Sequence, residues 1–295
     1  MLWKRDFGLT ARVWLTMFLL FVVYLVFLAV LWALGIGTSF LILIAVGMAF
    51  IQYFFSDKLV LWTTGSRIVA EDEFPELHQM IEQLCRQADL PKPKVAIMQS
   101  PVPNAFATGR SPKHAVVAVT DSIMRLLSRE ELEAVLAHEL SHVKNRDILT
   151  MTVASFIAMI ASIIMQNFLW GAMFGRRNSE GASAWIIAGI VAMIVYFVAN
   201  LLIMALSRYR EFAADRGSGY ITRNPRALIS ALSKISGRMD AVPAEYKAKV
   251  EGANAFFIIP ALSGKNTLLE LFSTHPALEK RIANLEKVEA ELRGY

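Results

Sequence analysis

The sequence predicts a mainly α-helical integral membrane protein with about four transmembrane helices and a small α+β part outside the bilayer. Of its 295 residues, 55% are hydrophobic and only 19% are charged, whereas soluble domains hold roughly 45–50% apolar and about 25% charged residues. Three long runs carry no charged residue, at residues 13–56, 148–175 and 181–207. A bilayer core of about 30 Å needs roughly 20 apolar helical residues, so the first run can supply two spans and the others one each.

The charge and cysteine content argue against two other classes of protein. The net charge is only +5, which fits anchoring charges at a membrane surface better than a nucleic-acid-binding surface. Cys85 is the single cysteine, so no intrachain disulfide can form. We therefore expect the lipid bilayer, and no nucleic acid, as a partner.

The first charge-free run divides into two spans. Its residues 35–39, Gly-Ile-Gly-Thr-Ser, favour a turn, which predicts spans near residues 13–34 and 40–55. Basic residues flank this pair on both sides: Lys4, Arg5 and Arg12 before it, and Lys58 and Arg67 after it. By the positive-inside rule both flanks are expected in the cytoplasm, so the pair is expected to form a hairpin.

The two later runs predict spans near residues 149–174 and 184–206; the alternative is a pair of helices buried in a soluble core. Residues 175–183 would then lie on the far side of the membrane, an orientation that Arg176 and Arg177 oppose. Four parts are therefore expected: a membrane hairpin (1–56), a soluble segment (57–147), a second hairpin (148–207) and a helical part on the same side as the soluble segment (208–295).

The soluble segment is expected to mix helices and strands. Pro75 opens a helical pattern with one apolar face, made of Leu77, Met80, Ile81, Leu84, Cys85 and Ala88. Residues 95–98 and 115–119 are short apolar runs of strand length between Pro, Gly and Ser residues. Ser128 and Glu131 form a capping-box pattern, which predicts that another helix begins there.

That last helix carries the sequence His138-Glu139-Leu140-Ser141-His142. Histidines four residues apart on a helix lie on one face, one turn apart, where both rings can bind the same zinc ion. Glu139 follows the first histidine and can take a proton from a water molecule that the metal activates. The alternative is a helix with two surface histidines, but five histidines in the whole chain make this pattern rare by chance. The soluble segment is therefore expected to be a small zincin-type catalytic domain.

A catalytic zinc site needs a third protein ligand. His78 and His114 have no partner at ligand spacing and are expected to be packing or surface residues. Glu211 and Asp215 lie four residues apart, just after the last span, so a helix places them on one face. Two membrane crossings separate them from His142, which puts them on the same side of the bilayer. The alternative is a pair of carboxylates on a solvated face.

These motifs in this order resemble the HtpX membrane proteases, which belong with the CAAX prenyl protease-like zinc metallopeptidases. The resemblance covers most of the chain, and further segments carry it: residues 104–109 (Asn-Ala-Phe-Ala-Thr-Gly), residues 210–215 (Arg-Glu-Phe-Ala-Ala-Asp), and Thr274-His275-Pro276 with Arg281. It implies Glu211 as the third ligand of one zinc ion per chain and Glu139 as the general base. It also implies that Asp215 is a hydrogen-bond partner of a ligand histidine.

Four further residues have two interpretations each. The resemblance implies that His275 and Arg281 stabilise the oxyanion of the reaction intermediate or hold the site together, whereas spacing alone favours a helix-entry histidine and a surface arginine. Asn145 and Asp147 follow the motif by about one turn, where they either cap the helix or brace the site.

Two segments are also open in interpretation. Residues Asn104, Ala105, Phe106 and Ala107 are either a loop between strands or the approach to an edge strand that pairs with an extended substrate. Residues 252–263 are apolar but too short to span a bilayer, and either pack in the soluble core or touch the membrane or substrate.

The sequence thus predicts a membrane-bound zinc endopeptidase that acts at the cytoplasmic face. The resemblance implies a bacterial inner membrane and quality control, with misfolded membrane proteins as polypeptide substrates; no oligomeric state is predicted. An intramembrane protease is disfavoured, because the charges around the motif would each cost about 2.5–3.5 kcal/mol at the bilayer centre. Two further possibilities are a non-enzymatic scaffold or transporter with a chance motif, and a prenyl-peptide processing protease, for which four spans are too few to enclose a large chamber.

Overall fold

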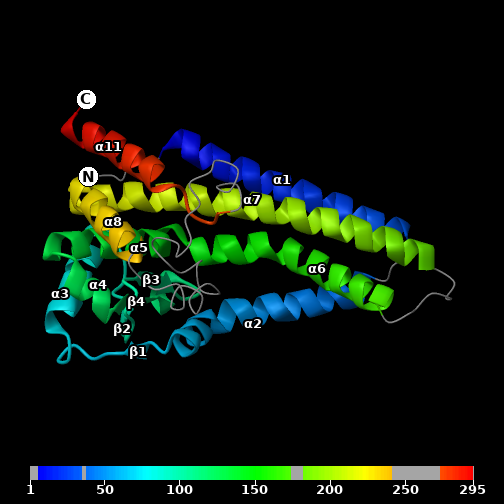
Figure 1. Ribbon diagram of the computed structural model, residues 1–295, viewed down its shortest axis with the longest axis horizontal. Coiled ribbons are helices and arrows are strands. Elements are labelled where there is room, and N and C mark those ends of the chain that lie inside the picture. The colour runs from blue at the N-terminus through cyan, green and yellow to red at the C-terminus, as the bar shows by residue number, and fades with distance from the viewer. Residues whose placement is uncertain (1–5, 35–37, 174–181, 241–272, 295) are drawn as a thin grey trace.

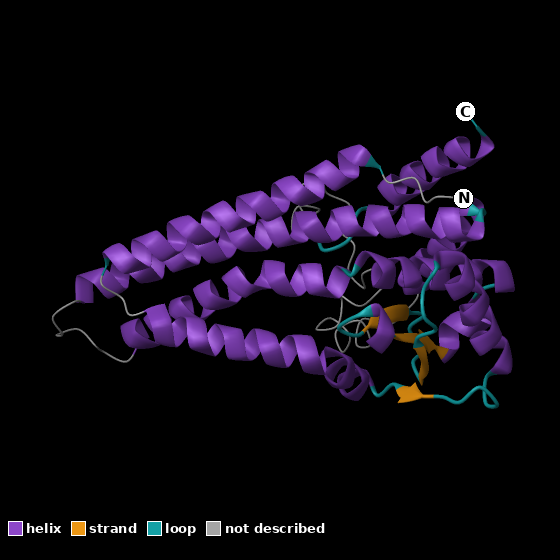
Figure 2. Ribbon diagram, turned by 180° about the vertical axis from the view of Figure 1, so that it is seen from behind, coloured by secondary structure: helices purple, strands orange, loops and turns teal. Residues whose placement is uncertain are grey.

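The computed structural model describes residues 6–34, 38–173, 182–240 and 273–294, apart from some side chains within the long helices. Four long helices lie side by side and project from a smaller body of short helices and strands (Figures 1 and 2). They are α1 (Phe7–Ala33), α2 (Thr38–Thr64), α6 (Asp147–Met173) and α7 (Ala182–Thr222). Helix α7 packs against both α1 and α6, and α2 packs against α6.

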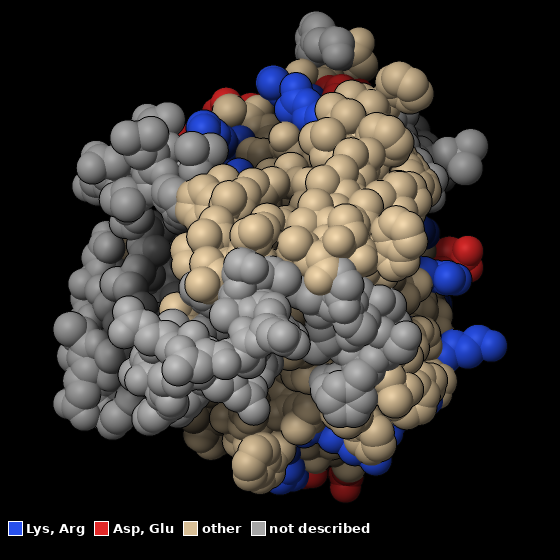
Figure 3. Space-filling model, turned by 90° about the vertical axis from the view of Figure 1, so that its right-hand side faces the viewer, with Lys and Arg blue, Asp and Glu red and all other residues tan. Residues whose placement is uncertain are grey.

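Three of these helices, α1, α6 and α7, are long and apolar enough to cross a membrane, and α2 has a shorter apolar stretch at residues 46–55. Their contact surfaces hold small residues, such as Ala158 on α6 and Ala192 and Ala199 on α7, which let helices approach closely. Large apolar side chains point outward instead, for example Trp14 and Phe18 on α1 and Phe197 on α7. Seen from the far end of the bundle, the described surface nearest the viewer is uncharged, with charged side chains at the periphery (Figure 3). A bundle that is apolar on the outside belongs in a bilayer, which excludes a pair of helices buried in a soluble core.

The predicted fold class is confirmed, but the helices do not end where the apolar runs end. Helix α2 continues past Asp57 to Thr64, and α7 continues past Ser207 to Thr222. A charge ends an apolar run without breaking the backbone hydrogen bonds of a helix, so a helix can leave the bilayer and enter the soluble body unbroken. Helix α1 begins at Phe7, because the Asp6 side chain accepts a hydrogen bond from the backbone of Leu9 and caps it. The apolar segment 252–263 and most of the loop predicted at 175–183 lie outside the described residues.

A four-stranded sheet forms the centre of the soluble body, with strand order β1-β2-β4-β3. The strands are β1 (Arg67–Ile68), β2 (Lys94–Met98), β3 (Ala105–Thr108) and β4 (Val116–Thr120). Strands β2 and β4 are parallel, and the two outer pairs are antiparallel. One face of the sheet packs in the core shared with α3 (Pro75–Ala88) and α5 (Arg129–Asn145), and the other packs near the end of α2.

Local sequence signals explain how α3 and α5 are placed. All six residues of the predicted apolar face of α3 are buried. The capping box is present at the start of α5, where the side chains and backbones of Ser128 and Glu131 exchange hydrogen bonds. The short helix η1 (Pro112–His114) lies between β3 and β4, and α4 (Asp121–Leu126) lies between β4 and α5. Helices α8 (Pro225–Asp240) and α11 (Leu278–Arg293) pack beside α7.

Candidate metal centre

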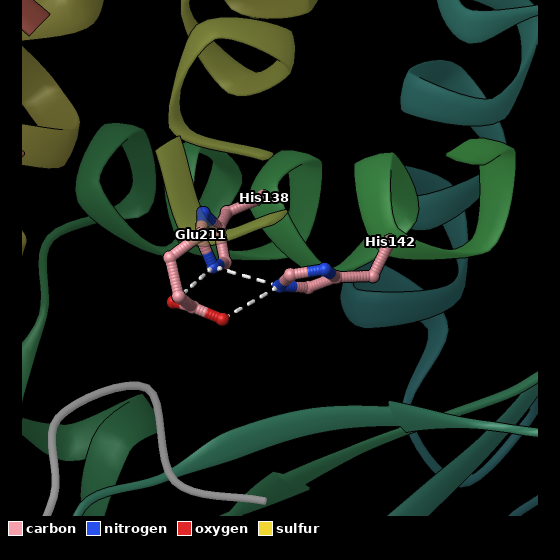
Figure 4. A group of neighbouring side chains, drawn as sticks. All are labelled: His138, His142 and Glu211. Carbon is pink, nitrogen blue, oxygen red and sulfur yellow. Dashed lines mark hydrogen bonds and ion pairs between the residues drawn. The ribbon is translucent and has the colours of Figure 1, made fainter. Parts of the chain in front are cut away.

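The structure brings together His138 and His142 from α5 and Glu211 from α7, although 68 residues of chain separate the second histidine from the glutamate. Each offers one ligand atom, and these atoms lie within 4.8 Å of one another. The two Nε2 atoms are 3.2 Å apart, and Glu211 carboxylate oxygens lie 3.3 Å from His142 Nε2 and 3.5 Å from His138 Nε2. Figure 4 shows the three side chains pointing toward one another.

A carboxylate lies beside the Nδ1 atom of each histidine ring. His138 Nδ1 lies 3.0 Å from Asp215 Oδ1, and His142 Nδ1 lies 2.5 Å from Asp147 Oδ2. A proton on each Nδ1 leaves a lone pair on each Nε2, and two such nitrogen atoms 3.2 Å apart repel each other unless a cation lies between them. Two imidazoles and one carboxylate are also a ligand set that catalytic zinc uses, so the residues fit a zinc ion.

The carboxylates around His138 and His142 favour a positive charge between the two rings. Burial alone would lower the pKa of His142, but Asp147 and Glu211 outweigh it and raise this pKa to about 10. Burial is likewise outweighed at His138, whose pKa is raised by Asp215 and Glu211. The carboxylates therefore stabilise a cation between the rings, whether it is a proton or a metal ion.

Glu139 is buried beside the ligands and lines the same cavity of about 370 Å³. Burial raises the pKa of its carboxyl group, while His138, His142 and a hydrogen bond from the backbone of Ala107 act in the opposite direction. A carboxylate with a raised pKa accepts protons more readily near neutral pH, as a general base requires.

His275 and Arg281 also reach the centre. His275 is buried, lines the cavity and places Nδ1 3.2 Å from Glu211 Oε2. Arg281 is 2% exposed and donates two hydrogen bonds to Asp215, of 2.6 and 2.9 Å, so the surface-arginine interpretation is wrong. These contacts are those of a residue that holds the site together, because Asp215 in turn faces His138.

The sequence alone does not decide between two roles, capping the helix or bracing the site, for two residues that follow the motif. Asn145 is exposed at the last position of α5, whereas Asp147 is buried and contacts His142. Arg210 contacts the other carboxylate oxygen of Asp147, with Nε 3.1 Å from Oδ1. The sequence places Asp147 about one turn after the motif, and this spacing does not distinguish capping from bracing.

Strand β3 runs along one edge of the sheet and lines the cavity beside the three ligands. Residues Ala105 and Ala107, expected to lie in a loop or in the approach to an edge strand, are part of the strand itself. The Thr120 amide donates to the Asn104 carbonyl at 2.9 Å. Since pairing alternates along an antiparallel ladder, the backbone polar groups of Ala105 and Ala107 point away from β4.

The two other described histidines lie outside the centre. His78 is buried on α3, and His114 is exposed and contacts Ser111. Neither belongs to the ligand group found among the described residues.

Comparison with known proteins agrees with this geometry. The family model of peptidase family M48 matches residues 71–289. The chain is 57% identical over 291 residues to "Protease HtpX homolog 2" of Methanosarcina acetivorans, covering 98% of both chains. It is 53% identical to "Protease HtpX homolog" of Moorella thermoacetica, covering 97% of this chain and 96% of that one.

A solved structure shares the fold. The crystal structure of Ste24p from S. mikatae superimposes with a TM-score of 0.55 at 19% identity, covering 94% of this chain and 67% of that one. At this identity the similarity concerns the fold alone.

Proposed function

The chain belongs to peptidase family M48 as a homologue of the HtpX proteases, and on this premise we propose that it hydrolyses peptide bonds of misfolded or membrane-inserted polypeptides at the cytoplasmic face. It is a membrane metallopeptidase whose long apolar helices hold it in the bilayer. The observation that carries the proposal is the convergence of His138, His142 and Glu211 beside the buried carboxylate of Glu139.

We propose that His138, His142 and Glu211 hold one zinc ion per chain. Zinc in such a site supplies Lewis-acid activation of a water molecule and of the scissile carbonyl. The two histidines are neutral ligands and Glu211 brings one negative charge, so the set offsets part of the charge of the ion while Asp215 and Asp147 support the rings.

Glu139 acts as the general base in this proposal. It accepts a proton from the attacking water molecule and passes it to the nitrogen of the leaving amine. His275 lines the same cavity and can donate a hydrogen bond to the developing oxyanion, a contribution that typically amounts to about 10²–10³ in rate. Arg281 acts through Asp215 and so holds His138 in place.

An extended substrate strand is proposed to pair with β3. The backbone groups of Ala105 and Ala107 point away from β4 and the strand lines the cavity of the metal centre, so an added strand would pass beside Glu139. Main-chain pairing recognises an unfolded segment with little dependence on its sequence, which suits a protease that removes misfolded proteins.

The basic residues near the soluble body support a cytoplasmic location of the centre. Arg208, Arg210 and Arg216 follow the apolar part of α7, and Lys58 follows that of α2. Relatives from the archaeon Methanosarcina acetivorans and the bacterium Moorella thermoacetica are both similar along nearly their whole length, so the family does not restrict the host to bacteria. No observation favours a prenylated substrate, because the similarity to Ste24p is one of fold.

The experiment that tests this function compares two states of one substrate. The full chain and its Glu139→Gln variant are reconstituted with zinc in liposomes, together with a membrane protein and a destabilised point mutant of it. The proposal predicts cleavage of the destabilised form at least about tenfold faster than of the stable form, and none by Glu139→Gln. Equal cleavage of both forms would contradict quality control while leaving the peptidase intact.

A further inference from the structure

Asp147 lies at the junction between the helix of the metal motif and a membrane span. Helix α5 ends at Asn145, Arg146 follows in the left-handed conformation with φ 56°, and α6 begins at Asp147. The Arg146 amide donates to the carbonyls of His142 and Val143, which closes the end of α5. The chain therefore stops one helix and starts the next within two residues.

This break is what brings Asp147 back to the metal centre. In an unbroken helix, a residue five positions after His142 would point about 140° away from it around the axis. The left-handed conformation of Arg146 changes the direction of the chain instead, so that Asp147 faces His142. Asp147 Oδ2 lies 2.5 Å from His142 Nδ1. A non-glycine residue in this conformation is uncommon and mildly unfavourable, so the contact rests on a backbone arrangement that the sequence must stabilise elsewhere.

The second carboxylate oxygen of Asp147 contacts α7, the other long helix of the same hairpin. Arg210 Nε lies 3.1 Å from Asp147 Oδ1, and Arg210 directly precedes the ligand Glu211 on α7. Both side chains have limited access to solvent, 15% for Arg210 and 5% for Asp147. Water therefore screens this pair weakly, and the carboxylate is held between an arginine and a ligand histidine.

We infer that Asp147 is a positioning residue for His142, held in turn by Arg210, so that the junction of the α6–α7 membrane hairpin sets the orientation of the second metal ligand. A carboxylate on Nδ1 fixes the tautomer and the plane of the ring, and it makes Nε2 a better donor. The geometry of the metal centre thus depends on how the chain is folded where α5 ends and α6 begins. The inference rests on the metal centre of the proposed function but not on its substrates.

The test measures metal binding before any substrate is added. Full-length protein in detergent is titrated with zinc against a chromophoric chelator, and the visible spectrum of the cobalt-substituted protein reports ligand geometry. Asp147→Asn is expected to lower zinc affinity roughly 10–100-fold and to change the cobalt spectrum, because the ring loses its charged partner.

A matched variant separates positioning from general stability. Arg216 and Glu291 form another ion pair of α7, with two hydrogen bonds of 3.1 and 2.9 Å, and neither residue belongs to the ligand group or lines the cavity beside it. Glu291→Gln is therefore expected to lower the melting temperature and leave zinc affinity and the cobalt spectrum unchanged. An equal loss of affinity in Glu291→Gln and Asp147→Asn would overturn the inference, as would an affinity within about twofold of wild type in Asp147→Asn.

A second variant decides the matter if Asp147→Asn does not fold. Arg210→Gln keeps the carboxylate but removes one of its two anchors. Its zinc affinity is expected to fall in the same direction, by a smaller factor of roughly 3–10, with the spectrum shifted toward that of Asp147→Asn. Unchanged affinity and spectrum in folded Arg210→Gln would overturn the role given to Arg210 and the coupling to the hairpin.

Discussion

Pairs of carboxylates and arginines surround the metal ligands on two sides. Asp215 faces His138 and is held by Arg281, and Asp147 faces His142 and is held by Arg210. Each histidine is therefore oriented by a carboxylate whose own position depends on an arginine. Ligands that are oriented in this way need little reorganisation when a metal ion binds.

The buried pair of Arg281 and Asp215 gives a prediction at this scale. Replacing Arg281 with Gln leaves the carboxylate of Asp215 buried without its cation, which is expected to lower the free energy of unfolding by about 3–5 kcal/mol. Arg293 is a matched control on the same helix, since its ion pair with Glu289 is exposed and should contribute less than about 1 kcal/mol. Chemical denaturation of both variants measures the difference, and similar losses would contradict the account.

Glu131 gives a prediction about pH. Burial would raise the pKa of its carboxyl group, but hydrogen bonds from Lys234, Ser230 and the Ser128 amide outweigh burial and lower the pKa to about 2. A carboxyl group whose pKa is about 4.5 in the unfolded chain therefore contributes its stabilisation fully above that pH. The contribution is lost as pH falls from about 4.5 toward 2.

The measurement compares wild type with Glu131→Gln across that range. The difference in free energy of unfolding between them is expected to be present at pH 6 and to shrink steadily below about pH 4.5. Glu130→Gln, an exposed position in the same turn, should change stability by less than about 0.5 kcal/mol at pH 6. A difference between wild type and Glu131→Gln that stays constant from pH 6 to pH 3 would show that the hydrogen bonds do not hold the charged form.

Some of these residues could be predicted from the sequence and others could not. The spacing of His138 and His142 determines their common helical face, so the pair needs no tertiary information. Glu211 lies on another helix, and the sequence alone left a choice of carboxylates until the resemblance to a family singled one out. Asp147 could not be assigned, because its contact depends on the backbone conformation of Arg146 and not on a pattern of residue types.

At the scale of elements, hydrophobic runs located the long helices but not their ends. Helix α7 shows the consequence, since its first part is apolar and its last part carries Glu211 and Asp215. One continuous helix therefore connects the membrane to the metal centre. Sheet order is a second limit, because β2 pairs with β4 and not with β3, the next strand along the chain, and short apolar runs do not specify their neighbours.

The contact between α7 and α11 depends on one glycine. A Cβ atom at Gly219 would lie 2.8 Å from a methyl group of Val288 and 3.2 Å from the ring of Pro225. Gly219→Ala is therefore expected to destabilise the protein by about 1–3 kcal/mol, because the helix carrying Arg281 would be pushed outward. Gly237 on α8 has no atom within 4 Å of such a Cβ, so Gly237→Ala should stabilise by about 0.5–1 kcal/mol.

Thermal unfolding of the two alanine variants distinguishes overpacking from helix propensity. A third protein with Gly219→Ala and Val288→Ala together should recover part of the loss, since the smaller side chain makes room for the new methyl group. Stabilisation by Gly219→Ala alone would mean that α11 packs less closely than described.

For the whole molecule, the bilayer part and the catalytic part are not separate bodies. Helices α6 and α7 are long and apolar enough to cross a membrane, and they also supply Asp147, Arg210, Glu211 and Asp215 to the centre, while α2 packs near the sheet that carries β3. Composition and charge-free runs were sufficient to predict a mainly helical membrane protein with a small mixed domain. They could not show that the membrane helices build half of the metal centre, because this follows from tertiary contacts.

The central claim is that the centre formed by α5 and α7 hydrolyses peptide bonds with Glu139 as the base. The most direct test is cleavage of an unfolded model protein in detergent with added zinc, by wild type and Glu139→Gln from matched purifications, with the zinc content of both measured. The account predicts zinc in both proteins, cleavage by wild type, and a loss of at least about 10³-fold in Glu139→Gln. Equal cleavage by the two proteins, with zinc bound in both, would contradict it.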